Sequence, residues 1–256
     1  AEKIVLSVED YNVTFDREIM EHVSFVLHAG DKVAIVGPNG TGKTTLLRDI
    51  IKGENPAIRL GENVKMAYLS QMHGEVFDEK ATVLKNFEDA GFDTDDQVIA
   101  YLKTYGFEEE LIYSPVCDLS GGEKNLLQLA KISRTGAGLL LLDEPTSHLD
   151  TYSQLALEQA VEKYNGTVLM VSHDFYTVAN CMDYVLLTED KGLRKVSMRK
   201  FRKMIYADHF DKDYLEYEQK KKELENRIAF ALQAGKYEDA KKISQELEKL
   251  LRKYNG

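Results

Sequence analysis

The sequence predicts an α/β protein built on a mainly parallel sheet. Short apolar runs alternate with helical patterns along the chain, and three of these runs are apolar on both faces, as strands covered by helices on two sides must be. The three runs are VAIV at 33–36, LLLLD at 139–143 and TVLMVS at 167–172. Two earlier runs rich in Val, Ile, Leu and Phe, at 4–8 and 23–27, predict further strands.

The first helix is expected directly after the strand at 33–36. That strand ends at Gly37, the segment GPNGTGKTT follows, and LLRDIIKG then has helical spacing with Gly53 as its stop. A further strand, VKMAYLSQ, closes at Gln71.

The middle of the chain predicts a small helical subdomain. Residues 80–112 carry helical patterns interrupted by Gly91 and Gly106, and Pro115 lies near the exit. Another helix is opened by SGGE at 120–123, and one more is expected at 151–163.

The amino-acid composition of the chain changes at about Asp208. Residues 211–256 are highly charged with both signs and give no strand signal, but apolar side chains recur at helical spacing on both sides of Gly235. The recurring residues are Leu224, Ile228 and Leu232, then Ile243, Leu247, Leu250 and Tyr254. We therefore expect a domain at 1–207 and a helical hairpin at 208–256.

Composition limits the classes of protein. The net charge of −10 argues against a protein that coats nucleic acid indiscriminately. The stretch KGLRKVSMRKFRK at 191–203 is nevertheless basic and lacks acidic residues. A solvated surface is its simpler interpretation, and contact with phosphates is the alternative.

The two cysteines, Cys117 and Cys181, form neither a disulfide framework nor a metal-ligand pattern, which fits a reducing cytosol. No apolar run approaches the roughly 18 residues of a membrane span, and the amino terminus lacks a signal-peptide profile. The chain begins at Ala1, which indicates either processing or a piece of a longer protein.

The segment from Gly37 to Thr44 fits the phosphate-binding pattern G-x-x-x-x-G-K-[ST], with a strand before it and a helix after it. Its glycines allow backbone N–H groups to surround a β-phosphate, and the helix N-terminus adds a positive dipole end. Lys43 is expected to reach the β- and γ-phosphate oxygens, and Thr44 to place a hydroxyl on Mg²⁺.

Two carboxylates lie at the end of the buried strand expected at 139–143. Asp143 ends this strand, where an unpaired carboxylate is costly, so a metal or its water is the expected partner. The side chain of Glu144 should diverge from it toward the γ-phosphate and polarise a water. The simpler alternative is an acidic pair that caps a strand.

Two further polar residues end strands. His173 follows MVS, and ligands in open α/β sheets bind beyond such strand ends, so a γ-phosphate role is expected; a structural histidine is the alternative. Gln71 is in the same position on its own strand and could contact Mg²⁺ and the attacking water; a purely structural glutamine is the alternative.

These motifs, in this order, resemble the ATP-binding-cassette (ABC) family over about residues 3–205. LSGGE at 119–123, about 20 residues before DEPTSHLD, is the most specific of them. The resemblance implies a P-loop ATPase fold with a mainly parallel sheet, an antiparallel β subdomain and a helical signature subdomain. It implies ATP and Mg²⁺ as ligands, Glu144, His173 and Lys43 as catalytic residues, and Thr44, Gln71 and Asp143 around the metal. The implied nucleotide contacts are Phe15 (in preference to Tyr11), Gly37, Asn39, Gly40, Thr41, Gly42, Lys43, Thr44, Thr45, Ser120, Gly121 and Gly122.

Within that family the chain is similar to the ABC-F branch, cytoplasmic proteins with two cassettes that act on ribosomes. The signature ends in Glu123, where transporters more often have Gln, and PTSHLD is close to the PTNHLD of that branch. The resemblance implies a translation or antibiotic-resistance factor. The ATP-binding subunit of a membrane transporter, with a permease as partner, is one alternative, and a module whose ATP only controls dimerisation is another.

The signature also has a local interpretation. Ser120 and Glu123 form a capping-box pattern, but Gly121 and Gly122 disfavour a helix, and a close approach to a ligand would offset this cost. In the family, the signature contacts the ATP held by an opposite cassette. We therefore expect a head-to-tail pair, with a second cassette in the same longer chain or in a second copy.

Overall fold

The computed structural model describes residues 3–69, 72–206 and 212–254. The chain divides into two compact units. The first contains Ala1–Leu69, Gly136–Ser147 and Val161–Ile205, and the second contains Ser70–Thr135, His148–Ala160 and Tyr206–Gly256. Each unit is built from segments distant in the sequence.

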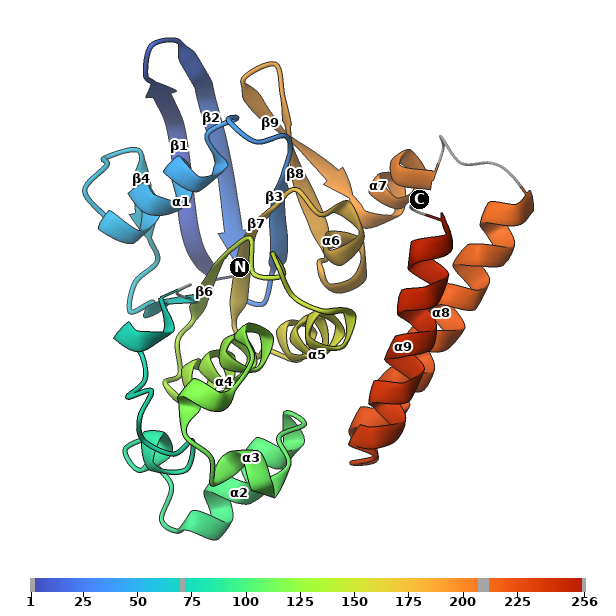
Figure 1. The fold of residues 1–256 in the computed structure, drawn as a ribbon. Coiled ribbons are helices and arrows are strands. Elements are labelled where there is room, and N and C mark those ends of the chain that lie inside the picture. The colour runs from blue at the N-terminus through green and yellow to red at the C-terminus, as the bar shows by residue number, and fades with distance from the viewer. Residues whose placement is uncertain (1–2, 70–71, 207–211, 255–256) are drawn as a thin grey trace. The chain divides into compact units, whose positions relative to one another are not determined.

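The first unit contains a six-stranded sheet in the order β5-β6-β7-β3-β8-β9 (Figure 1). All neighbouring pairs are parallel except β8 and β9, which form an antiparallel hairpin. The strands are β3 (Lys32–Val36), β5 (Met66–Leu69), β6 (Leu139–Asp143), β7 (Thr167–Ser172), β8 (Tyr184–Glu189) and β9 (Gly192–Ser197). The predicted parallel sheet is confirmed, and its central strands are buried along their length.

A second sheet in the same unit is antiparallel, in the order β2-β1-β4. Its strands are β1 (Ile4–Thr14), β2 (Glu18–His28) and β4 (Ile58–Leu60), so the first two are much longer than expected from their apolar runs. Asp10 and His22 have positive φ at irregularities in the β1–β2 register, and these bulges hide the alternation that would reveal a long strand. The antiparallel subdomain implied by the family resemblance is confirmed.

Helix α1 (Lys43–Lys52) follows the glycine-rich segment and ends at Gly53, which caps it in the left-handed conformation as predicted. One apolar core contains side chains from α1, from the antiparallel sheet and from β3, β6 and β7. The Tyr11 hydroxyl donates to Asp49 Oδ2 at 2.6 Å, which joins β1 to α1. This core fixes the end of α1 from which the candidate site is built.

Sequence reasoning missed the end of the first unit. Asp190 and Lys191 both have positive φ, as in a two-residue type I′ turn, but lack the glycine that usually signals one. The basic stretch at 191–203 covers strand β9 and the first part of helix α7 (Met198–Tyr206). Helix α6 (Phe175–Cys181), which Asp174 caps, was also not predicted.

The second unit is helical apart from one isolated β-bridge in its described part. Its helices include α2 (Asp95–Thr104), α3 (Glu109–Ile112) and α4 (Gly121–Arg134), with short 3₁₀ turns η1 (His73–Glu75), η2 (Lys85–Phe87) and η3 (Val116–Asp118). Helix α5 (Thr151–Glu162) runs through the boundary between the two units in the sequence. Phe87, Leu102, Phe107 and Leu127 are buried in the core of this unit.

The predicted hairpin is confirmed as α8 (Lys212–Gln233) and α9 (Tyr237–Tyr254), which lie side by side (Figure 1). Leu224, Ile228 and Leu247 share a core with Leu155 of α5. The Tyr237 hydroxyl donates to the Lys103 carbonyl at 2.7 Å. The hairpin is thus packed on other helices of its unit.

In the part of the chain that the structure describes, no helix is both long and apolar enough to span a membrane.

Candidate active site

The glycine-rich segment forms a loop between β3 and α1. Gly40 and Gly42 have φ values of 79° and 86°, which side chains other than glycine rarely adopt. Gly42 is also the N-cap of α1, and no side chain caps this helix end. The N-terminal N–H groups of α1 therefore remain available for an anion, which the helix dipole also favours.

Lys43 lies inside this loop. Its Nζ donates to the carbonyls of Gly37 and Pro38, each at 2.7 Å, and the residue is only 4% exposed. Burial lowers the pKa of Lys43, against the opposing attraction of Glu144 and Asp143. The loop thus holds a cation that a bound polyphosphate would stabilise.

Thr44 and Asp143 place two hard oxygen ligands together. The Thr44 hydroxyl donates to Asp143 Oδ1 at 3.3 Å. Burial raises the pKa of Asp143, and Glu144 raises it further, whereas Thr44 lowers it. A divalent cation would relieve this cost, and oxygen ligands of this type fit Mg²⁺, which takes its remaining ligands from water and phosphate.

Glu144 and His173 form a second polar pair. Glu144 Oε1 lies 2.9 Å from His173 Nδ1, and Glu144 Oε2 accepts the backbone N–H of His173 at 3.3 Å. Glu144 has φ of 46°, an unfavourable conformation for a side chain of this size, directly after β6. The imidazole is 55% exposed, so it is accessible to a ligand beyond the strand ends.

Thr188 of β8 packs against the start of the phosphate loop. A Cβ on Gly37 would lie 1.7 Å from Thr188 Oγ1, so no larger residue fits at Gly37 without movement. Thr188 Oγ1 is buried and has no hydrogen-bond partner among the described residues. This packing requirement adds to the phosphate-binding reason for a glycine at this position.

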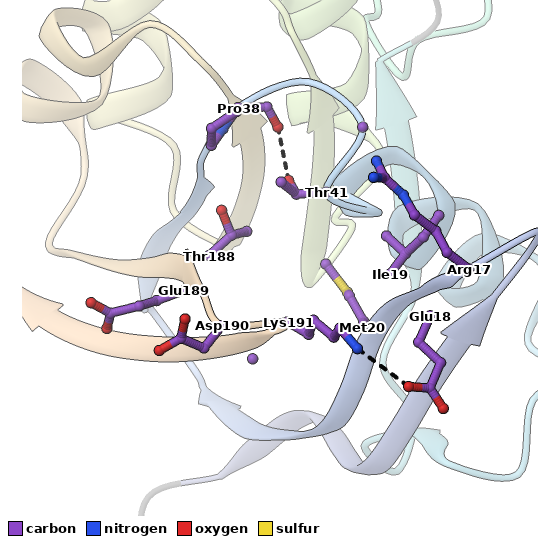
Figure 2. Close-up of a pocket in the computed structure, with 12 residues that line it drawn as sticks. Arg17, Glu18, Ile19, Met20, Pro38, Thr41, Thr188, Glu189, Asp190 and Lys191 are labelled. Carbon is purple, nitrogen blue, oxygen red and sulfur yellow. Dashed lines mark hydrogen bonds and ion pairs between the residues drawn. The ribbon is translucent and has the colours of Figure 1, made fainter.

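A pocket of about 350 Å³ lies beside the phosphate loop (Figure 2). Three segments line the pocket: Pro38, Gly40 and Thr41 of the loop, Arg17–Met20 at the start of β2, and Thr188–Gly192 around the β8–β9 turn. Figure 2 shows the hydrogen bond from Thr41 to the Pro38 carbonyl and Lys191 reaching Glu18. Sequence reasoning missed this pocket because the β8–β9 turn comes from a distant part of the chain.

The remaining predicted contacts of the first unit differ in exposure. Phe15, between β1 and β2, is 64% exposed and so presents a free ring, whereas Tyr11 is fully buried. Tyr11 is therefore excluded as a stacking platform. Asn39 is exposed, and Thr41 and Thr45 are half-buried.

Gln71 lies outside the described residues. The signature residues belong to the second unit, where the predicted capping box is confirmed: the Glu123 N–H donates to Ser120 Oγ at 3.2 Å and the Ser120 N–H to Glu123 Oε2 at 2.8 Å. The two glycines have different surroundings. A Cβ on Gly122 would lie 2.3 Å from Ser153 Cβ, whereas a Cβ on Gly121 would meet nothing within 4 Å.

Gly122 therefore has a packing role in addition to the ligand approach that the sequence predicts for it. It allows α4 to approach α5 closely, and only Gly121 presents open space beside the helix N-terminus.

Together, the uncapped helix N-terminus, the buried lysine and the two carboxylates at the end of β6 define the first unit as a P-loop nucleoside triphosphatase. The family model described as "ABC transporter" matches residues 20–147, half of the chain. The protein belongs to the ABC ATPase family, and it is an ATPase cassette.

Curated relatives include members of the ABC-F branch. The chain is 38% identical to ABC transporter F family member 5 of Arabidopsis thaliana over 73% of this chain and 28% of the relative. It is 37% identical to the putative ATP-binding protein YdiF of Bacillus subtilis, over 71% of this chain and 29% of the relative. It is 33% identical to the energy-dependent translational throttle protein EttA of Escherichia coli K12, over 85% of this chain and 38% of the relative. The chain thus spans well under half the length of these relatives.

Solved structures confirm the cassette fold. The chain matches an inward-facing putative metal-chelate type ABC transporter at a TM-score of 0.62 and 25% identity, covering 77% of this chain and 84% of the other. It also matches an ATP-binding cassette in a dimeric post-hydrolysis state with ADP and Pi, at a TM-score of 0.60 and 20% identity. This match covers 76% of this chain and 99% of the other.

Proposed function

We propose that this cassette hydrolyses ATP with Mg²⁺, with Glu144 as the residue that orients and deprotonates the attacking water. The observation that carries this proposal is the position of Glu144 directly after β6, beside His173 and next to Asp143. Water attacks the γ-phosphorus, the bond to the β–γ bridging oxygen breaks, and ADP and phosphate leave. Glu144 accepts the proton of the water.

Lys43 and His173 bind the γ-phosphate. Lys43 leaves the carbonyls of Gly37 and Pro38 for phosphate oxygens, a change that its buried charge favours. His173 leaves Glu144 and donates to a γ-phosphate oxygen. Both residues thus stabilise charge on the group that is transferred.

Thr44 and Asp143 are the proposed protein ligands of the metal. The family motif supports Gln71 as a third contact. Mg²⁺ held by these residues would neutralise charge on the β- and γ-phosphates. The oxygens of Thr44 and Asp143 already face each other, so little rearrangement is needed for this role.

The nucleoside end of ATP lies toward Phe15 and the pocket of Figure 2. The exposed ring of Phe15 is available for stacking on adenine. The pocket begins two residues further on, at Arg17, and shares Thr41 with the phosphate loop. The ribose and phosphates can therefore pass along one continuous surface.

A second cassette supplies the other half of the composite site. Ser120, Gly121 and Gly122 bind the γ-phosphate on the partner cassette, which is either part of a longer chain or a second copy. Ser120 is exposed and Gly121 has open space beside it, as such an approach requires. ATP binds the closed pair more tightly than the open pair, and this difference drives closure.

We propose that the cassette acts on the ribosome in the cytoplasm, as an ABC-F translation factor or by antibiotic resistance through ribosome protection. The similarity to EttA and to ABC-F member 5 supports this role. Residues 1–207 form the nucleotide-binding domain and 208–256 its helical extension. The exposed basic side chains Arg199, Lys200 and Lys203 of α7 are candidates for contact with ribosomal RNA.

Co-sedimentation with ribosomes tests this role. The native full-length protein carrying Glu144→Gln should co-sediment with ribosomes in ATP and less so in ADP. Equal recovery in the supernatant with either nucleotide would contradict a ribosomal role.

The alternative is the ATP-binding subunit of a membrane transporter, which the structural match to a metal-chelate type transporter supports. Recovery of the native protein in a membrane complex with a permease, and not with ribosomes, would favour it. A module whose ATP only controls dimerisation would pair with another cassette when ATP is present. It would be recovered with neither ribosomes nor a permease.

A further inference from the structure

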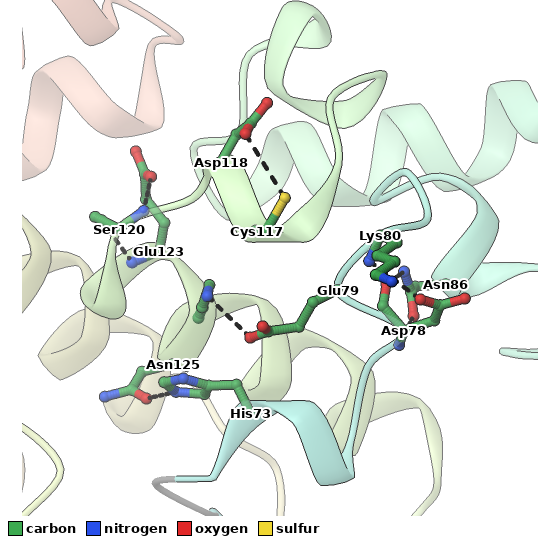
Figure 3. Close-up of polar contacts among 11 residues, drawn as sticks. His73, Asp78, Glu79, Lys80, Asn86, Cys117, Asp118, Ser120, Glu123 and Asn125 are labelled. Atoms are coloured by element: carbon green, nitrogen blue, oxygen red, sulfur yellow. Dashed lines mark hydrogen bonds and ion pairs between the residues drawn. The ribbon is translucent and has the colours of Figure 1, made fainter.

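Two side-chain contacts join the first turns of α4 to the segment at residues 73–79 (Figure 3). Lys124 Nζ lies 2.9 Å from Glu79 Oε1, and the Lys124 side chain is only 15% exposed. His73 Nε2 donates to Asn125 Oδ1 at 2.6 Å. Lys124 and Asn125 directly follow the capping box that begins at Ser120.

The backbone also joins residues 79–81 to η3, which directly precedes the signature. The Cys117 N–H donates to the Glu79 carbonyl at 2.9 Å, and the Val116 N–H donates to the Ala81 carbonyl at 3.0 Å. Glu79 therefore contacts both sides of the signature, with its carbonyl before Ser120 and its carboxylate after it.

The capping box alone does not orient the signature. It fixes the conformation of Ser120 relative to Glu123 within one turn, but the direction of the helix end depends on contacts outside that turn. The Glu79–Lys124 pair supplies such a contact. The Lys124 side chain is only 15% exposed, so losing Glu79 would leave the Lys124 charge poorly solvated; the Glu79 side chain is 38% exposed.

We propose that the Glu79–Lys124 ion pair, supported by His73–Asn125, is a positioning device that aims Ser120 at the γ-phosphate on the opposite cassette. This inference rests on the proposed pairing of cassettes. Neither Glu79 nor Lys124 touches the nucleotide. Their loss should reduce turnover in the closed pair and leave nucleotide binding at the phosphate loop of the same chain unchanged.

The test compares Glu79→Gln and Lys124→Gln with Glu109→Gln in the full chain, together with the second cassette where the native protein has one. The control changes an ion pair of similar length in the same unit, Lys103–Glu109 at 2.8 Å, which is away from the signature and about half exposed on both sides. We expect kcat to fall by about three- to ten-fold in the first two variants. In the control, kcat should stay within about two-fold.

Two further variants separate positioning from folding. Lys124→Arg keeps the charge and should retain most of the activity, and the exchanged pair Glu79→Lys with Lys124→Glu should recover much of the activity that each single change removes. The dissociation constant of a fluorescent ATP analogue and the melting temperature are measured for each variant.

The inference is overturned if Glu79→Gln and Lys124→Gln behave like the control. It is also overturned if their activity follows melting temperature alone, with no recovery in the exchanged pair. Failure of the pairing proposal looks different: ATP would then fail to bring together two cassettes that already carry Glu144→Gln and an intact Glu79–Lys124 pair.

Discussion

His173 Nδ1 lies 2.9 Å from Glu144 Oε1, and the His173 amide donates to the second oxygen of the same carboxylate. The residue that we propose as the catalytic base and the residue that we propose for the γ-phosphate thus contact each other in the first unit. In the proposed mechanism, ATP binding exchanges this contact for contacts with phosphate and water.

Replacing this base gives the first prediction. Glu144→Gln keeps the shape of the side chain but removes the proton acceptor, so kcat should fall by about 10²- to 10⁴-fold. ATP affinity should change little, because Lys43 and the loop N–H groups remain. Single-turnover hydrolysis and equilibrium ATP binding measure the two quantities. Unchanged hydrolysis would contradict the assignment.

Asp143 gives a prediction about pH and stability. Its folded-state pKa is raised above the ordinary value of 3.8, mainly by burial, so between those two pKa values the folded state binds more protons than the unfolded state. The free energy of unfolding therefore decreases as pH rises through this window. At neutral pH without nucleotide, Asp143→Asn should raise the melting temperature.

The gain from Asp143→Asn should disappear below pH 3.8, where the carboxyl is protonated in both states. In the wild type, ATP with Mg²⁺ should raise the melting temperature more than ATP alone. Asp143→Asn should lose this difference, because the metal loses its charged ligand. If Asp143→Asn instead lowers the melting temperature at neutral pH without nucleotide, burial is not the main influence on the pKa of Asp143.

The two signature glycines form a matched pair. Gly122→Ala would force a Cβ to within 2.3 Å of Ser153 Cβ and should reduce the free energy of unfolding by about 1–3 kcal/mol. Gly121→Ala meets open space and should be neutral or stabilising, by up to about 1 kcal/mol. Chemical denaturation of both variants measures the difference. Equal stabilities would contradict the packing role of Gly122.

The basic stretch can be divided by what each side chain contacts. Arg202 Nη2 donates to the Ala179 carbonyl at 2.6 Å, so it anchors α7 to α6. Arg199, Lys200 and Lys203 are exposed. Changing these three to Gln should weaken ribosome binding, and the salt slope should decrease by about one for each phosphate that the variant no longer binds.

The control for α7 is the same number of charge changes elsewhere, at Lys241, Lys242 and Lys249 of α9. If both triple variants bind ribosomes with the wild-type salt slope, the basic face of α7 is a solvated surface.

The hairpin depends on its neighbours. Leu155 of α5 completes the core that contains Leu224 and Ile228, and Tyr237 donates to the Lys103 carbonyl. A peptide of residues 208–256 should therefore be much less helical alone than in the full chain, because short helices gain most of their stability from packing. Circular dichroism of the peptide measures this. Full helicity in isolation would show an independent element.

The sequence by itself determined the local features of this protein. The apolar runs predicted β3, β6 and β7 within one residue of their ends, and Gly53 and the capping box at Ser120 set helix ends correctly, because these signals act within a few residues. The phosphate loop and the polar residues after β6 and β7 were also found in this way, since each follows a buried strand directly.

Only the tertiary structure decided what depends on contacts between distant segments. The sequence does not show that Thr188 packs on Gly37, that Gly122 makes room for Ser153, or that Glu79 pairs with Lys124. It also did not reveal β8 and β9, whose turn has no glycine at its two central positions. The three contacts join residues far apart in the chain, and their proximity follows from the packed core, which local patterns do not specify.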